Sequence, residues 1–146
     1  MKHSGLIPTE KIIARLQYEN PWWINSKIPD TYESMPRRLY LELFYPFVTE
    51  QDIRRAVVLM GPRRLGKTVM MYHTIAHLIN EGVDAQKIFF IVIDNPIYIN
   101  LGLQDIFDMC QEAVGNTHLK GTYVFFDEIQ YLKDWERHLK VLVDSY

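Results

Sequence analysis

The stretch that most constrains the fold of this chain is an eight-residue motif, Gly61-Pro62-Arg63-Arg64-Leu65-Gly66-Lys67-Thr68. It fits the pattern of a glycine, any four residues and then Gly-Lys-Thr, which cradles phosphate groups when it lies between a strand and a helix. The flanks are correct, because an apolar run (56–60) precedes the motif and a helix-compatible run (69–81) follows it. The motif therefore predicts an α/β fold in which a buried parallel strand leads through the loop into a long helix.

Each position of the loop has a physical role in binding a nucleotide. Gly61 and Gly66 lack a Cβ atom, so the backbone can bend sharply and approach phosphate oxygens closely. Successive N–H groups and the positive end of the following helix then attract the anion. We expect Lys67 to contact the β- and γ-phosphates and the Thr68 hydroxyl to ligate Mg²⁺. The residues expected to bind the nucleotide are Gly61, Pro62, Arg63, Arg64, Leu65, Gly66, Lys67, Thr68 and Val69.

A later apolar run, residues 123–126, ends in two carboxylates, Asp127 and Glu128. We expect Asp127, at the tip of this strand, to hold Mg²⁺ together with Thr68. Glu128 would polarise the water that attacks the γ-phosphate. An acidic pair after a strand is a weak signal alone, but it gains weight downstream of a complete phosphate-binding loop. The catalytic candidates are thus Glu128 and Lys67, and the candidate metal ligands are Thr68 and Asp127.

The remaining apolar patterns supply the other elements of such a fold. Apolar residues three and four apart predict helices over 9–19, 69–81, 103–114 and 134–144. Continuous apolar runs predict buried strands over 56–60, 88–93 and 123–127. Residues 39–43 give only a weak signal for a helix or a strand. Trp22 and Trp23 lie in an irregular, proline-punctuated lead-in, and we expect them to pack on the core in preference to anchoring an interface.

Some polar residues leave alternatives open. His73, His77 and Glu81 are four residues apart, a spacing that could hold a metal, although a solvated helix face is the favoured interpretation. Asp94 follows the strand at 88–93, at the edge where ligands of open α/β sheets bind. It either faces the nucleotide or only begins a turn.

Charge and composition exclude several classes of protein. Sixteen basic and eighteen acidic residues give a net charge of −2, which argues against a general nucleic-acid binder. The basic pair Arg37-Arg38 would lie either near the nucleotide or, as we favour, in a solvated turn. The single cysteine, Cys110, excludes an internal disulfide and is expected to be a buried thiol. We find neither a secretory signal nor an apolar run of membrane-spanning length, and therefore expect a cytoplasmic protein.

Three segments resemble one known family: the loop at 61–68, Phe125-Phe126-Asp127-Glu128-Ile129-Gln130, and Trp135 with Leu139-Lys140 and Leu142-Val143-Asp144. The family is that of prokaryotic AAA-superfamily ATPases whose P-loop domain precedes a C-terminal domain of unknown function. The resemblance covers about residues 38–146 and implies a P-loop NTPase fold, a three-layer α/β/α arrangement around a parallel sheet. We divide the chain into an N-terminal helix and irregular lead-in (1–37) and an AAA-type P-loop ATPase domain (38–146).

The sequence departs from this family near its end. In the family, a further strand with a polar sensor residue follows and inserts between the loop strand and the acidic strand. The sequence stops at residues 144–146, before that strand begins. We therefore expect an N-terminal fragment, truncated before the sensor strand and lacking any arginine finger. Such a fragment would be inactive by itself, and would be unstable alone or close its sheet differently.

The resemblance implies an ATP-binding domain that hydrolyses ATP with Mg²⁺ in the complete protein; ATP rather than GTP rests on the resemblance alone. The alternative is a nucleotide-gated switch or scaffold that binds ATP with little or no hydrolysis, which the missing sensor favours. A helicase would need two lobes and a basic groove. A small-molecule kinase would need an arginine-rich lid, where the chain offers only Arg137. The expected partners are the nucleotide and either another protein or a second copy of the chain. We expect no membrane partner, and the net charge argues against nucleic acid.

Overall fold

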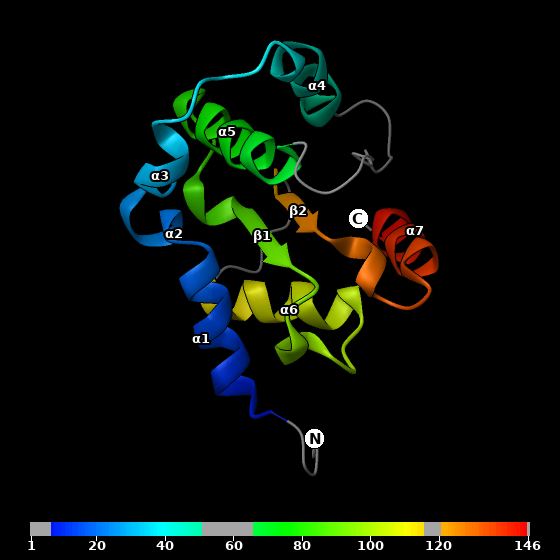
Figure 1. Cartoon of the computed structure of the whole chain (residues 1–146). Coiled ribbons are helices and arrows are strands. Elements are labelled where there is room, and N and C mark those ends of the chain that lie inside the picture. Colours follow the sequence, from blue (N-terminus) through cyan, green and yellow to red (C-terminus); the bar gives the residue numbers. More distant parts are fainter. Residues whose placement is uncertain (1–6, 51–65, 116–120, 146) are drawn as a thin grey trace.

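The computed structural model describes residues 7–50, 66–115 and 121–145. The apolar run at 56–60, predicted as the strand before the loop, lies outside the described residues, as do residues 61–65 of the loop itself. Figure 1 shows the arrangement of the described helices and strands. The helices are α1 (Thr9–Glu19), α2 (Trp22–Asn25), α3 (Asp30–Glu33), α4 (Tyr40–Thr49), α5 (Lys67–Asn80), α6 (Leu103–Val114) and α7 (Trp135–Ser145). The strands are β1 (Ile88–Val92) and β2 (Tyr123–Asp127), and short 3₁₀ turns cover Ala85–Lys87, Pro96–Tyr98 and Ile129–Tyr131.

The two described strands pair in parallel, with Ile88 opposite Tyr123 and Val92 opposite Asp127. The pairing extends one residue past β1, because the Ile93 N–H donates to the Asp127 carbonyl at 2.9 Å. The strands predicted at 88–93 and 123–127 are thus confirmed, the first shortened by one residue. How the sheet continues beyond the described residues, and whether the chain is stable alone, stay predictions.

A helix covers each face of the strand pair. Phe90 packs against Tyr72 of α5, with ring centroids 4.8 Å apart. Its neighbour Phe89 packs against Phe107 of α6 at 5.5 Å. Because adjacent residues of a strand point to opposite faces, α5 and α6 lie on opposite sides of β1 (Figure 1). The predicted α/β class with a parallel sheet is confirmed in this part of the chain.

The predicted helices are confirmed with small shifts at their ends. The helix predicted over 103–114 is α6, with the same bounds, and Cys110 on it is fully buried. Burial raises the pKa of the Cys110 thiol, as we expect for a structural cysteine. The helix predicted over 134–144 is α7, shifted by one residue, with Leu142 buried. None of the helices in the described ranges is long and apolar enough to cross a membrane.

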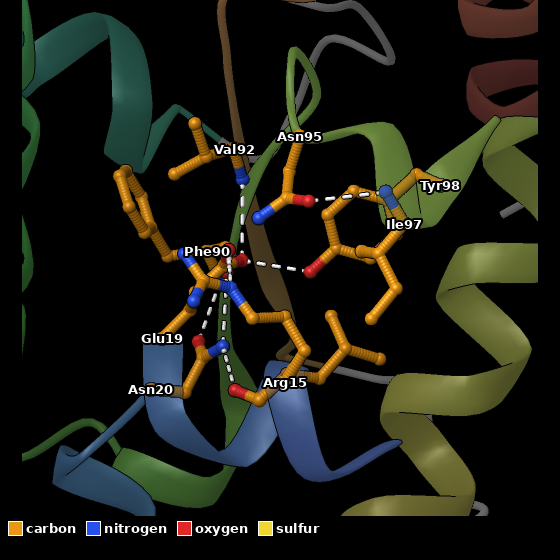
Figure 2. Close-up of polar contacts among 9 residues, drawn as sticks. Arg15, Glu19, Asn20, Phe90, Val92, Asn95, Ile97 and Tyr98 are labelled. Atoms are coloured by element: carbon orange, nitrogen blue, oxygen red, sulfur yellow. Dashed lines mark hydrogen bonds and ion pairs between the residues drawn. The ribbon is translucent and has the colours of Figure 1, made fainter. Parts of the chain in front are cut away.

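The N-terminal segment closes the edge of β1 that faces away from β2. Asn20 donates from Nδ2 to the Phe90 carbonyl at 2.9 Å and accepts the Phe90 N–H at 2.7 Å. Glu19 accepts the Val92 N–H at 3.4 Å. Figure 2 shows these side chains standing beside β1 in the place where the backbone of another strand would run.

Two adjacent tryptophans continue this closure at the start of β1. The indole N–H groups of Trp22 and Trp23 both donate to the Ile88 carbonyl, at 2.9 and 2.8 Å. Trp22 then packs edge-on against Phe90, and Trp23 packs edge-on against Phe89. One tryptophan therefore covers each face of the strand, and the prediction that both pack on the core is confirmed. The lead-in predicted as irregular contains two short helices, α2 and α3.

The face of α5 that was predicted to be solvated is covered at one end. Tyr32 of α3 stacks on Tyr72, with centroids 4.1 Å apart, and its carbonyl lies 2.7 Å from His73 Nε2. His73 is therefore buried, which corrects the prediction, whereas His77 and Glu81 are exposed. Across the ranges 7–50, 66–115 and 121–145, no three His, Cys, Asp or Glu side chains gather as metal ligands.

Helix α4 covers another part of α5. It arises from the weak signal at 39–43 and extends to Thr49. Leu41 and Phe44 on its inner face form a small apolar cluster with Met70 of α5. Thus α3 and α4 both rest on the helix that begins at the phosphate-binding motif.

Candidate functional site

The motif residues within the described part form the first turn of α5. Gly66 precedes the helix with φ +81° and ψ 20°, a left-handed conformation that glycine adopts at far lower cost than other residues. Its carbonyl accepts the Met70 N–H at 2.9 Å, which is the first hydrogen bond of the helix. Lys67, Thr68 and Val69 follow, all half-buried. The left-handed backbone conformation at this position therefore favours glycine over residues that carry a Cβ atom.

The start of α5 meets the tip of β2 through a single hydrogen bond. The Thr68 hydroxyl donates to Asp127 Oδ2 at 2.7 Å, although the two residues are 59 positions apart. Asp127 is the last residue of β2 and is buried. The structure thus places the two candidate metal ligands in direct contact; their role as ligands stays a prediction.

These two oxygens suit the metal that the sequence predicts. Hydroxyl and carboxylate oxygens are the hard ligands that Mg²⁺ prefers. Adjacent ligands of an octahedral Mg²⁺, each 2.0–2.1 Å from the ion, lie about 3 Å apart. The separation of 2.7 Å between Thr68 and Asp127 is close to this value, so a small opening of the contact would admit the ion between them.

The surroundings of Asp127 disfavour its charged form. Burial raises the pKa of the Asp127 carboxyl above its ordinary value, and the hydrogen bond from Thr68 opposes this rise. The negative charges of Glu128 and Asp94 raise the pKa further. A cation bound here would favour the charged carboxylate, and so would oppose both the effect of burial and the repulsion from the two neighbouring carboxylates. Asp94 is exposed in the turn after β1, as one of the two interpretations has it, and its charge acts on Asp127; that it faces a nucleotide stays a prediction.

Glu128 has an unusual backbone conformation. Its φ of 57° and ψ of 41° are left-handed, which is costly for a residue with a side chain. Such strained positions cluster at functional sites, where the surrounding structure holds them in place. Glu128 is half-buried, and Gln130 Nε2 donates to its Oε1 at 3.3 Å. Its role as the base that activates water stays a prediction.

Arg37 and Arg38 are both exposed, as the favoured interpretation has it, yet Arg38 also lies at the candidate site. The guanidinium of Arg38 lies against Gly66: a Cβ atom placed on this glycine would be 3.1 Å from Arg38 Cζ. The sequence marks Arg37-Arg38 as a basic pair that could lie near the nucleotide, but it does not indicate which of the two arginines approaches Gly66. Of the predicted nucleotide-binding residues, Gly61, Pro62, Arg63, Arg64 and Leu65 lie outside the described residues.

A family model described as AAA domain matches residues 53–146, which is well over half of the chain. No curated protein and no solved structure matched the chain. The matched region begins after α4 and includes the whole loop, α5, β2 and the acidic pair. The chain therefore belongs to the AAA domain family, whose domains bind ATP.

Proposed function

We propose that this chain is the ATP-binding part of an Mg²⁺-dependent ATPase. The observation that supports the proposal is the 2.7 Å contact between Thr68 and Asp127. It joins the end of the phosphate-binding motif to a buried carboxylate, which is the pairing that a magnesium nucleotide requires. The match to the AAA domain family supports the same conclusion from the sequence side.

In this proposal each residue has one task. The N–H groups at the start of α5 and the Lys67 ammonium bind the β- and γ-phosphates. The Thr68 hydroxyl and the Asp127 carboxylate hold Mg²⁺, which when bound offsets charge on the phosphate oxygens. Glu128 orients a water molecule in line with the bond to the leaving phosphate and accepts its proton. Catalysis then consists mainly of positioning and charge stabilisation.

A second candidate function is a nucleotide-gated switch with little hydrolysis. It is favoured by the position of the two metal ligands on different elements, Thr68 on α5 and Asp127 on β2. An ion bound to both oxygens would lengthen their contact slightly, so the nucleotide state would influence the spacing of α5 and β2. Any element that packs on either of them would then respond to the nucleotide.

The test is ATP binding by isothermal titration calorimetry, with Mg²⁺ and then with EDTA, followed by single-turnover hydrolysis. We expect the wild-type chain to bind ATP, Lys67→Ala to lose binding, and Thr68→Ala to lose the difference between Mg²⁺ and EDTA. Glu128→Gln should bind ATP normally and hydrolyse none. Tight binding without hydrolysis by the complete protein would favour the switch, and absence of ATP binding in the wild type would overturn both candidates.

A further inference from the structure

Arg38 lies at the phosphate-binding turn although it comes 28 positions before Gly66 in the sequence. The position that a Cβ on Gly66 would occupy is 3.1 Å from Arg38 Cζ and 3.3 Å from both Nη1 and Nη2. These three atoms of the guanidinium are thus nearly equidistant from that point. The flat face of the guanidinium therefore rests on the residue that immediately precedes Lys67.

The fold determines this position on both sides of the arginine. Before it, α3 is fixed to α5 by the Tyr32 ring and by the 2.7 Å hydrogen bond between the Tyr32 carbonyl and His73. After it, α4 is fixed to α5 by the cluster of Leu41, Phe44 and Met70. Only a short segment joins these two anchors, and Figure 1 shows it passing over α5. The packing of α3 and α4 on α5 therefore positions Arg38 at the start of α5.

The neighbouring arginine has a different task. Arg37 donates to the Glu33 carbonyl at 3.0 Å and to the Met35 carbonyl at 3.2 Å. It also forms an ion pair with the Glu33 carboxylate at 2.9 Å. These contacts close the end of α3 and hold the Arg37 guanidinium there. Of the two adjacent arginines, only Arg38 approaches Gly66, which makes Arg37 a matched control.

We propose that Arg38 is a phosphate-binding residue that contacts the terminal phosphates of ATP beside Lys67. This inference rests on the proposed function. The guanidinium is permanently charged and its planar fork forms paired hydrogen bonds with phosphate oxygens. At Gly66 it lies beside the N-terminus of α5, which carries partial positive charge, and next in sequence to Lys67. A bound polyphosphate would be attracted both by this guanidinium and by the N-terminus of α5.

The position beside Gly66 also determines which part of the nucleotide is contacted. In the proposed site the Gly66–Thr68 turn faces the β- and γ-phosphates. Arg38 would therefore strengthen binding of ATP more than that of ADP, and contribute little to binding of AMP. A residue that stacked on the base or shaped the pocket would affect all three nucleotides alike.

The experiment compares wild type, Arg38→Ala, Arg38→Lys and Arg37→Ala by calorimetric titration with ATP, ADP and AMP at constant Mg²⁺ and ionic strength. A charge-assisted hydrogen bond contributes about 1.5–3 kcal/mol, so we expect Arg38→Ala to weaken ATP binding about 10- to 100-fold. Arg38→Lys should recover part of the loss, because it keeps the charge but not the fork. Arg37→Ala should bind all three nucleotides like the wild type. Melting temperatures of each variant report whether the fold is retained.

The outcomes separate this inference from the proposed function. If the wild type binds ATP and Arg38→Ala binds it equally tightly, Arg38 is not a phosphate ligand and the proposed function stands. Equal weakening of ATP, ADP and AMP would also overturn the inference. Should Arg38→Ala fail to fold, Arg38→Gln replaces it, with the same expected order of losses. If the wild type binds no nucleotide, the proposed function and the inference fail together.

Discussion

The side-chain amide of Asn20 hydrogen-bonds with both main-chain groups of Phe90, donating to the carbonyl at 2.9 Å and accepting the N–H at 2.7 Å. These are the bonds that a further strand would form at this edge of the sheet. The Ile93 N–H bonds to β2, and Phe90 lies three positions before it. Because successive residues of a strand direct their main-chain groups to alternate edges, those of Phe90 point away from β2. Asn20 therefore replaces a strand with a single side chain and protects an edge that would otherwise invite pairing with another chain.

Replacing Asn20 by alanine should destabilise the chain strongly. Asn20 is fully buried, and its Nδ2 also donates to the Leu16 carbonyl at 2.7 Å. The substitution leaves the Phe90 N–H buried without a partner, and each such loss costs about 1–3 kcal/mol. We expect the free energy of unfolding in urea to fall by about 3 kcal/mol.

The matched control is Asn25→Ala, because Asn25 is exposed and its side chain only accepts the Lys27 N–H. Its loss should be within about 0.5 kcal/mol. Equal effects of the two substitutions would show that the edge contact contributes nothing to stability. Size-exclusion chromatography of folded Asn20→Ala then tests whether the uncovered edge promotes association.

The two tryptophans at the start of β1 should act together. Trp22 and Trp23 donate to the same carbonyl, that of Ile88, so either one alone still leaves it with a donor. Trp→Phe at one position removes a hydrogen bond and some packing, whereas the double substitution also leaves a buried carbonyl without any partner. We expect the double variant to lose about 1 kcal/mol more than the sum of the single losses. Strict additivity in urea unfolding would contradict the shared role.

Local patterns predicted part of this fold well, because the signals were carried by neighbouring residues. Helix α6 follows from the spacing of its apolar side chains, and β2 follows from a continuous apolar run that ends in Asp127. The pairing of Thr68 with Asp127 was expected because motif and strand tip belong to one known arrangement. The role of Asn20 gave no such signal, since its partner Phe90 is 70 positions away.

The adjacent arginines show the same limit at the candidate site. Arg37 and Arg38 are identical in type and share one local context, yet one closes α3 and the other approaches Gly66. Their separation depends on how α3 and α4 pack on α5, which is a tertiary property. His73 was placed on a wet face for the same reason, because nothing near it in the sequence indicates that α3 covers it.

Asp127→Asn should stabilise the fold at neutral pH while it weakens binding of magnesium nucleotide. Burial raises the pKa of Asp127 in the folded chain. A carboxyl with a raised pKa favours folding fully below its unfolded pKa, and this contribution is lost as the pH rises through the folded pKa. The neutral amide avoids that loss and can still accept the Thr68 hydroxyl.

Thermal melts of wild type and Asp127→Asn from pH 3 to pH 8 test this expectation. The melting temperature of the variant should exceed that of the wild type at pH 7, and the difference should vanish toward pH 3. Asp108→Asn, at an exposed aspartate on α6, is the control and should show no such trend. A variant that is less stable at pH 7 would mean that the Asp127 charge is compensated in the fold, which contradicts the expected sign.

Gly66→Ala should lose both stability and nucleotide affinity, and a second glycine separates the two effects. Gly66 and Gly115 both have left-handed backbones, with φ of +81° and +67°. Alanine in this region costs about 1–2 kcal/mol, so both substitutions should lower the free energy of unfolding by a similar amount.

A Cβ on Gly115 meets no atom within 4 Å, whereas one on Gly66 meets the Arg38 guanidinium. We therefore expect only Gly66→Ala to weaken ATP binding, by about tenfold or more, since it blocks close approach of the backbone to phosphate and displaces Arg38. If Gly115→Ala weakened ATP binding to the same extent, the loss would come from reduced stability of the whole chain, and the turn at Gly66 would have no special part in holding the nucleotide.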